Sequence, residues 1–191
     1  MKMIFQTAAL AAAIAAVPGT AMAQKTPPAV IVVIDVQKIF AECTACKAAQ
    51  TQLQSQAQQL QTLAQTLGQP LRTEAEAIQQ AAGGKEPDAA LKARIEALQT
   101  KENQANQQLQ QRQQAFQRNR AYVAQQIEAK LSPIYTQVMQ AHGANIAVDT
   151  QATLAAAAGL DVTNEVMTQL NTQLPSVSTT APPPPAQPAS R

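Results

Sequence analysis

Two long stretches of this chain carry apolar residues three or four positions apart, and a short cluster of turn residues separates them. The first stretch has these at Leu53, Ala57, Leu60, Ala64, Leu67, Leu71, Ala75 and Ile78. The second has them at Leu91, Ile95, Leu98, Ala105, Leu109, Phe116, Val123, Ile127, Leu131, Ile134 and Val138. This spacing places side chains on one stripe of an α-helix and is typical of a coiled-coil seam. The pattern predicts two long amphipathic helices.

The cluster between them, Gly83-Gly84-Lys85-Glu86-Pro87-Asp88, predicts a chain reversal, with Pro87 placed to open the second helix. Limbs of roughly 50 residues would give arms of about 70 to 80 Å. Pro70 and Pro133 interrupt the pattern without shifting its phase, so we expect kinks there rather than helix ends. His142 and Gly143 are expected to close the second helix. The polar residues on its stripe, which predict looser pairing, are Glu102, Arg112 and Asn119.

Strand signals lie at both ends of this hairpin. The β-branched run Val30–Asp35 follows two prolines, and Asn145–Asp149 is a second strand candidate that the hairpin returns to the same place. The stretch 152–158 is ambiguous between helix and strand. Asp161 is a suitable N-cap for a final amphipathic helix that ends near Leu174.

The two termini have different characters. Lys2, the apolar run Ile4–Val17 and the small residues Ala21-Met22-Ala23 predict a secretory signal peptide, with a mature chain beginning near Gln24. A membrane anchor is the alternative, but the run is shorter than the ~20 residues that span a bilayer. Residues 175–191 are rich in Pro, Ser, Thr and Ala, which predicts a disordered tail, or alternatively a proline-rich ligand for an envelope partner.

These features predict a mainly α protein with a small β body, in which a long antiparallel helical hairpin is inserted between short strands. The expected organisation is a signal peptide over 1–23, a body built from 24–40 and 144–174, a helical arm over 41–143 with its tip near 83–88, and a tail over 175–191. Aromatic residues make up only 3% of the chain and tryptophan is absent. Thin helical layers suit such a composition better than a broad core packed to native density.

Charge argues against a nucleic-acid partner. Without Lys2 the chain has 13 basic and 12 acidic residues, far from the concentrated positive charge that phosphate binding requires. Between residues 103 and 127 the only charges are Arg112, Arg118 and Arg120. They suggest a mild basic face on the second helix, which is either an ordinary solvated face or a contact surface for clients or a membrane.

The segments AVIVVIDVQKIF (29–40) and NIAVDTQATLAAAAGLDVTNEVMTQLN (145–171), on either side of the glutamine-rich hairpin, resemble the Skp/OmpH family of periplasmic chaperones. The resemblance covers Val30 to Leu174. It implies a homotrimer whose strands form a small β-barrel, with Thr153–Ala156 as a third strand and the hairpins surrounding a cavity. It also implies an ATP-independent holdase that keeps unfolded outer-membrane proteins from aggregating. A lipopolysaccharide site cannot be carried over, because no matching basic cluster is present.

Chemical motifs are few. Cys43 and Cys46 form a C-x-x-C that we place a turn or two into the first arm, where a structural disulfide is the preferred interpretation. Free thiols and redox or metal chemistry are the alternatives. His142 is the only histidine, so neither a metal site nor a Ser-His-carboxylate set is expected, and Gly83-Gly84-Lys85 lacks P-loop spacing. We therefore predict no enzyme and no cofactor. The rival to a chaperone is an envelope adaptor that binds a partner through the hairpin tip.

Overall fold

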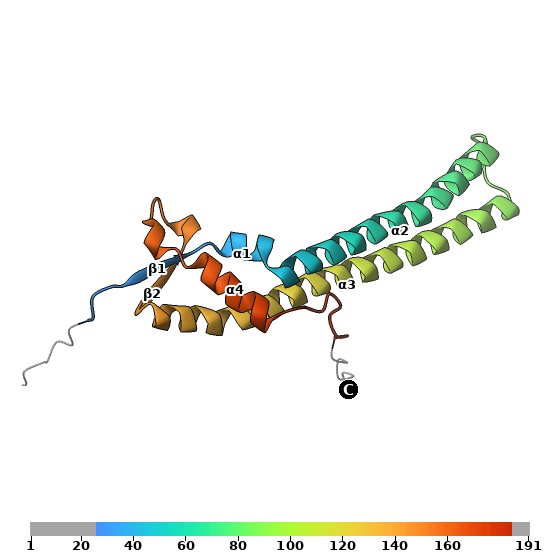
Figure 1. Cartoon of the computed structure of the whole chain (residues 1–191). Coiled ribbons are helices and arrows are strands. Elements are labelled where there is room, and N and C mark those ends of the chain that lie inside the picture. Colours follow the sequence, from blue (N-terminus) through green and yellow to red (C-terminus); the bar gives the residue numbers. More distant parts are fainter. Residues whose placement is uncertain (1–25, 185–191) are drawn as a thin grey trace, which may run out of the picture.

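The structure, a computed structural model, describes residues 26–184 and is mainly helical, with a small pair of strands at one end (Figure 1). Its elements in chain order are strand β1 (Ile31–Ile34), helix α1 (Val36–Glu42), helix α2 (Thr44–Ala82), helix α3 (Ala89–Ala141), strand β2 (Ile146–Asp149) and helix α4 (Thr163–Gln173), with short 3-10 turns at Thr150–Ala152 and Ala158–Leu160. None of the helices described is long and apolar enough to cross a bilayer. The signal peptide predicted over 1–23 lies outside the described residues. The expected class, mainly α with a small β part, is confirmed.

Strands β1 and β2 form a parallel pair, in a register that matches Ile31 with Ile146 and Ile34 with Asp149. Parallel strands need a crossover connection, and here the long helices supply it. The side chain of Asn145 extends the pairing, because its Oδ1 accepts a hydrogen bond of 2.8 Å from the Val30 N–H. The two strand candidates therefore meet as the sequence predicted.

Strand β1 ends before Asp35 and not at it, because Asp35 caps a helix. Its Oδ1 accepts a hydrogen bond of 2.8 Å from the Lys38 N–H, and its own N–H donates to Thr163 Oγ1 at 2.8 Å. Helix α1 then stops at Glu42, where Cys43 adopts φ −58° and ψ 144°. The long first helix consequently starts at Thr44, and α1 lies within the predicted body except for its last two residues, 41 and 42.

The third strand that the resemblance implied at Thr153–Ala156 does not form. The backbone is extended at Thr153 (φ −116°, ψ 139°) and Ala157 (φ −66°, ψ 142°), but residues 26–184 provide no strand beside it. A ladder needs a hydrogen-bonding partner, and a single subunit does not supply one here. The open edge of β1 is met instead by a single bridge to Asp161.

The main core lies where β1, α1, α4, the start of α2 and the last third of α3 come together. It contains Val32, Ile34, Ile39, Cys43, Ala45, Cys46, Ala49, Val123, Ile127, Leu131, Ile134, Val138, Val162, Val166, Leu170 and Leu174. Ile39 and Ile134 are 0% exposed. Most of the buried apolar area that stabilises the fold is thus at one end of the molecule.

Helices α2 and α3 lie side by side and antiparallel, and they extend far beyond this core (Figure 1). A second, smaller cluster near the turn contains Ile78, Leu91 and Leu98. Between the two clusters the stripe residues of α2, including Leu60 and Leu67, are only half buried. Both Pro70 and Pro133 lie within continuous helices, so neither ends one.

The reversal between α2 and α3 uses backbone conformations that favour glycine. Gly83 and Gly84 have φ values of 51° and 74°, which side chains with a Cβ adopt at a cost. Asp88 rather than Pro87 opens α3, since its Oδ1 accepts a hydrogen bond of 2.8 Å from the Leu91 N–H. Pro87 lies one position before this cap and not in the first turn.

The end of α3 matches the prediction. The helix finishes at Ala141, with His142 as its C-cap and Gly143 at φ 62°. Glycine is favoured there because the left-handed conformation lets the following N–H groups reach the last free carbonyls. The chain then enters β2 directly.

The start of α4 differs by one residue from the prediction. Val162 is the residue at the N-cap position, but Asp161 still performs the capping, because its Oδ1 accepts a hydrogen bond of 2.9 Å from the Thr163 N–H. Hydrogen bonds from the Thr163 side chain and backbone hold the pKa of Asp161 below its ordinary value. Thr163 Oγ1 also accepts from Asp35, so one threonine links the end of β1 to the start of α4.

We expect Asp161→Ala to lower the free energy of unfolding near neutral pH by about 0.5–2 kcal/mol, the usual effect of losing a cap. A depressed folded-state pKa stabilises the protein while the carboxylate is charged, and this contribution disappears as the pH falls through that pKa. The deficit relative to wild type should therefore shrink in acid. Chemical denaturation over a pH series measures it. Asp161→Asn, which keeps an acceptor without the charge, is the control, and an equal deficit at every pH would contradict the explanation.

Candidate functional site

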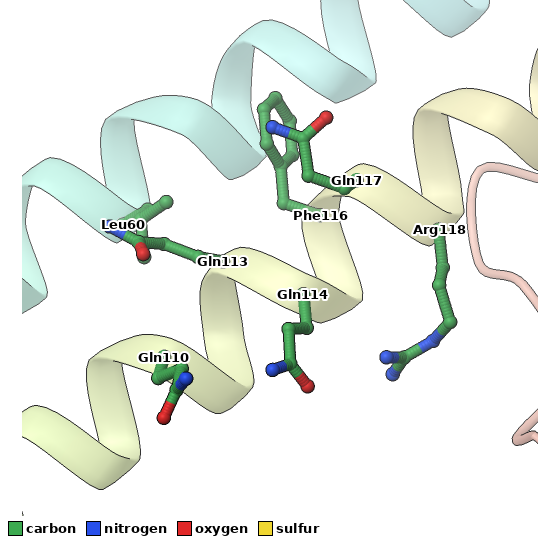
Figure 2. Close-up of a pocket in the computed structure, with 7 residues that line it drawn as sticks. All are labelled: Leu60, Gln110, Gln113, Gln114, Phe116, Gln117 and Arg118. Carbon is green, nitrogen blue, oxygen red and sulfur yellow. The ribbon is translucent and has the colours of Figure 1, made fainter.

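An open hollow lies between α2 and α3 in the middle of the helix pair, and Figure 2 shows the residues around it. Its volume is about 760 Å³, within the range of roughly 300–1,000 Å³ found for small-ligand sites. The lining residues are Leu60, Gln110, Gln113, Gln114, Phe116, Gln117 and Arg118. Amide side chains thus surround one leucine and one phenylalanine. Such a surface can hold apolar groups and bond to peptide groups, but it contains no acid–base pair.

A second hollow adjoins the first, because Leu60, Phe116 and Arg118 line both. Its other lining residues come from α2, from α3 and from the segment after α4: Gln56, Gln59, Leu63, Arg112, Ala115, Asn119, Thr180 and Ala181. The two hollows form a continuous surface along the helix pair. The segment after α4 closes one end of this surface.

Part of that segment, residues 177–181, lies against the helix pair, whereas the sequence predicted a disordered tail from residue 175 (Figure 1). Leu174 is 8% exposed, and Val177 packs against the main core. The composition of the tail suggested that it could not fold by itself, and it has no helix or strand. The helix pair supplies hydrogen-bonding partners that composition cannot reveal. The remaining residues of the tail, 185–191, lie outside the described chain.

Three amide side chains of the helix pair hold the tail. The bonds are Gln126 Nε2 to Ser178 O (2.9 Å), Ser178 N to Gln126 Oε1 (3.0 Å), Gln56 Nε2 to Thr179 O (3.0 Å) and Ala181 N to Asn119 Oδ1 (2.8 Å). Gln56 and Asn119 are themselves joined, because Asn119 Nδ2 donates to Gln56 Oε1 at 2.9 Å. We call Gln56, Asn119 and Gln126 the amide ladder.

The sequence did not identify the amide ladder as a site. A partial signal was available, since Asn119 occupies a seam position where an apolar residue was expected. A polar residue at such a position implies a hydrogen-bonding partner across the seam, and that partner is Gln56. Nothing in the local sequence of Gln126 distinguishes it from the many other glutamines of α3.

The three arginines of the predicted basic face do not lie together. Arg112 and Arg118 line the second hollow, but Arg120 lines neither hollow. An α-helix turns about 100° per residue, so Arg118 and Arg120 point about 160° apart. The helix pair therefore presents two arginines beside the hollows rather than a patch of three.

Cys43 and Cys46 form a disulfide, with 5.0 Å between their Cα atoms. The pair lies at the N-terminus of α2 and not a turn or two into the arm, because α1 ends at Glu42. Cys43 Sγ also accepts a hydrogen bond of 3.0 Å from the Cys46 N–H. The two residues are 0% and 2% exposed. Thiol exchange requires an attacking thiolate to reach a sulfur, so this burial favours a structural clamp at the junction of the two helices.

We expect Cys43→Ala/Cys46→Ala to lower the free energy of unfolding by about 2 kcal/mol, the entropic effect of opening a short loop. The holdase activity expected from the family resemblance should stay unchanged. Denaturation with and without reductant measures the first effect. Wild type in reductant should approach the double variant. Loss of function at a temperature where the double variant is still folded would instead support the redox interpretation.

The side chain of His142, at the C-terminal end of α3, lies next to a carboxylate of α4. Its Nε2 lies 2.8 Å from Glu165 Oε2 of α4, and both side chains are about 40% exposed. No group of three or more metal-ligating side chains occurs in the part of the chain that the structure describes. The contact joins the end of α3 to α4, in keeping with a structural role for the histidine.

Comparisons with protein families and with solved structures identify proteins that are similar to this chain. The model of the family described as "Outer membrane protein (OmpH-like)" matches residues 30–170. A crystal structure of an OmpH-like protein from Caulobacter crescentus, proposed to be an outer membrane chaperone, superposes with a TM-score of 0.66 at 22% identity, covering 81% of this chain and 93% of that one. A search of curated proteins found no match. Because the family model spans both strands, the helix pair and most of α4, the chain belongs to the OmpH-like outer membrane protein family.

Proposed function

We propose that this protein is an ATP-independent holdase that binds unfolded outer-membrane proteins in the periplasm and prevents their aggregation. The observation that carries the proposal is the long helix pair, whose leucine and phenylalanine side chains are only half buried through the middle and are surrounded by amides. Unfolded β-barrel proteins expose alternating apolar residues and unpaired peptide groups. A surface with both kinds of contact, each weak, suits a client of no fixed structure.

The proposal includes a homotrimer held by the small body. Large apolar side chains are exposed at this end of the single chain: Val30, Ile31, Ile146, Leu154 and Leu160. Leu154 is 107% exposed, and the extended segment around it has no strand partner among residues 26–184. Apolar patches and open strand edges of this kind mark interaction sites. Neighbouring copies of the chain would cover both features and would arrange the helix pairs around a cavity.

The test is the aggregation of a urea-denatured outer-membrane β-barrel protein after dilution, followed by light scattering without nucleotide. We expect the protein to suppress scattering near one trimer per client. The matched control is Lys85→Ala/Glu86→Ala, which changes only exposed side chains of the tip between α2 and α3. It should act like wild type, because a cavity between arms does not depend on the tip surface. Unchanged aggregation in the presence of wild type would refute the holdase.

A further inference from the structure

The hydrogen bonds from the helix pair to residues 178–181 do not depend on the side chains of those residues. All four hydrogen bonds from the amide ladder end on main-chain atoms, namely the N–H and C=O of Ser178, the C=O of Thr179 and the N–H of Ala181. The hydroxyl of Ser178 bonds within the tail, donating to Thr180 O at 3.0 Å and accepting from Thr180 N at 3.3 Å. The ladder therefore recognises main-chain groups of the tail, although the chain bends at Thr179 and Thr180.

Gln126 shows the recognition most directly. Its amide donates to the carbonyl of Ser178 and accepts from the N–H of the same residue, at 2.9 and 3.0 Å. This reciprocal pair resembles the bonding between opposite residues of an antiparallel ladder. Any residue with a free N–H, held in the same position, offers the same two groups. Asn119 and Gln56 each form one hydrogen bond with a main-chain group of the tail.

The ladder also adjoins an apolar surface. Thr180 and Ala181 line the second hollow with Leu60, Phe116 and Arg118, and the last three continue into the first. In Figure 2 the segment after α4 passes beside Arg118, and the ring of Phe116 lies between the two helices. A client segment that contains apolar residues could bond to the ladder and place an apolar side chain in a hollow. The resident tail has only threonine and alanine at this point.

We propose that the amide ladder is a binding site for the main chain of polypeptides, that residues 178–181 occupy it in the free protein, and that a segment of an unfolded client displaces them. The identity of the displacing partner rests on the proposed holdase function. The tail acts as a tethered competitor, and a tether of this length gives an effective concentration on the order of millimolar. The tail prevents weak partners from occupying the site. A client that also fills the hollows binds strongly enough to displace the tail.

The experiment uses a chain shortened after Val177, which keeps Leu174 and Val177 in the core. Two fluorescein-labelled peptides serve as probes: one with the sequence of residues 174–184, and one of equal length that alternates leucine and serine. Fluorescence anisotropy gives their affinities. Because the competitor is gone, we expect the shortened chain to bind both peptides on the order of tenfold more tightly than the full chain.

The matched variants are made in the shortened chain. Asn119→Ala/Gln126→Ala should abolish the gain, while Gln125→Ala, an exposed neighbouring amide that contacts no tail residue, should retain it. Alanine is the best helix former, so α3 should stay intact in both. Equal affinities for the full and shortened chains would overturn the proposal. Binding of the tail peptide alone, or undiminished binding by the double variant, would also overturn it.

Failure of this site is distinguishable from failure of the holdase. If the shortened chain gains peptide affinity through the ladder but the full chain does not slow aggregation, the binding site stands and the client assignment falls. If the full chain slows aggregation while tail removal leaves peptide affinity unchanged, the holdase stands and the ladder serves only to fasten the tail.

Discussion

Leu170→Ala is expected to lower the free energy of unfolding by about 2–5 kcal/mol, the range for removing a large aliphatic side chain from a packed core. Leu170 is 0% exposed on α4 and packs within the main core, which also contains β1, α1 and the last third of α3. This core is the principal attachment between the strands and the helix pair. Removing the Leu170 side chain should therefore cause the body to unfold at a lower denaturant concentration.

The matched control is Leu63→Ala, the same change at a half-buried position of α2. We expect a loss below about 1 kcal/mol there, because less apolar area is removed and alanine favours the helix. Far-ultraviolet circular dichroism during chemical denaturation measures both variants. Each should be measured at two protein concentrations, since assembly would make stability concentration-dependent. Equal losses at the two leucines would contradict the assignment of the core.

Leu154→Lys is expected to weaken self-association by at least about tenfold and to reduce holdase activity with it. One unpaired ammonium per subunit would have to enter an apolar contact, and burying a charge without a partner costs more than the ~1.4 kcal/mol that a tenfold change represents. Leu154 is fully exposed in the single chain, so the fold of the subunit should be unaffected. Light scattering coupled to size exclusion gives the molar mass, and the aggregation assay gives the activity.

The control for this prediction is Gln104→Lys, which adds the same charge at an exposed position of α3, outside the body. It should assemble like wild type. A Leu154→Lys protein that keeps the mass and activity of wild type would show that this face of the body is not the contact between subunits. The proposed cavity would then lack its anchor.

Local sequence signals predicted those parts of the fold that depend only on residues close together in the sequence. The apolar stripes located both long helices, the glycine pair located the reversal, and His142 with Gly143 located the end of α3. Each is decided by backbone conformation or by spacing within one element. The disulfide was likewise the preferred interpretation of a C-x-x-C in a chain predicted to be exported, although its place relative to the helices was not foreseen.

The errors occurred where an element is decided by a distant segment. Asp35 caps α1 and bonds to Thr163, which lies 128 residues away in sequence, so β1 ends at Ile34 rather than at the predicted Asp35. The segment after Thr150 remains unpaired because no strand of the described chain lies beside it.

By itself, the sequence determined the periodicity of the long helices, the reversal between them, the end of α3 and the strand pair, because these follow from spacing, glycine conformations and β-branched runs. Only the tertiary structure decided how residues 178–181 are held, because the polar partners of their backbone come from glutamine and asparagine side chains on α2 and α3. Those side chains look like ordinary solvated residues until folding aligns them. The proline-rich tail acquires its place from the surface it meets and not from its own composition.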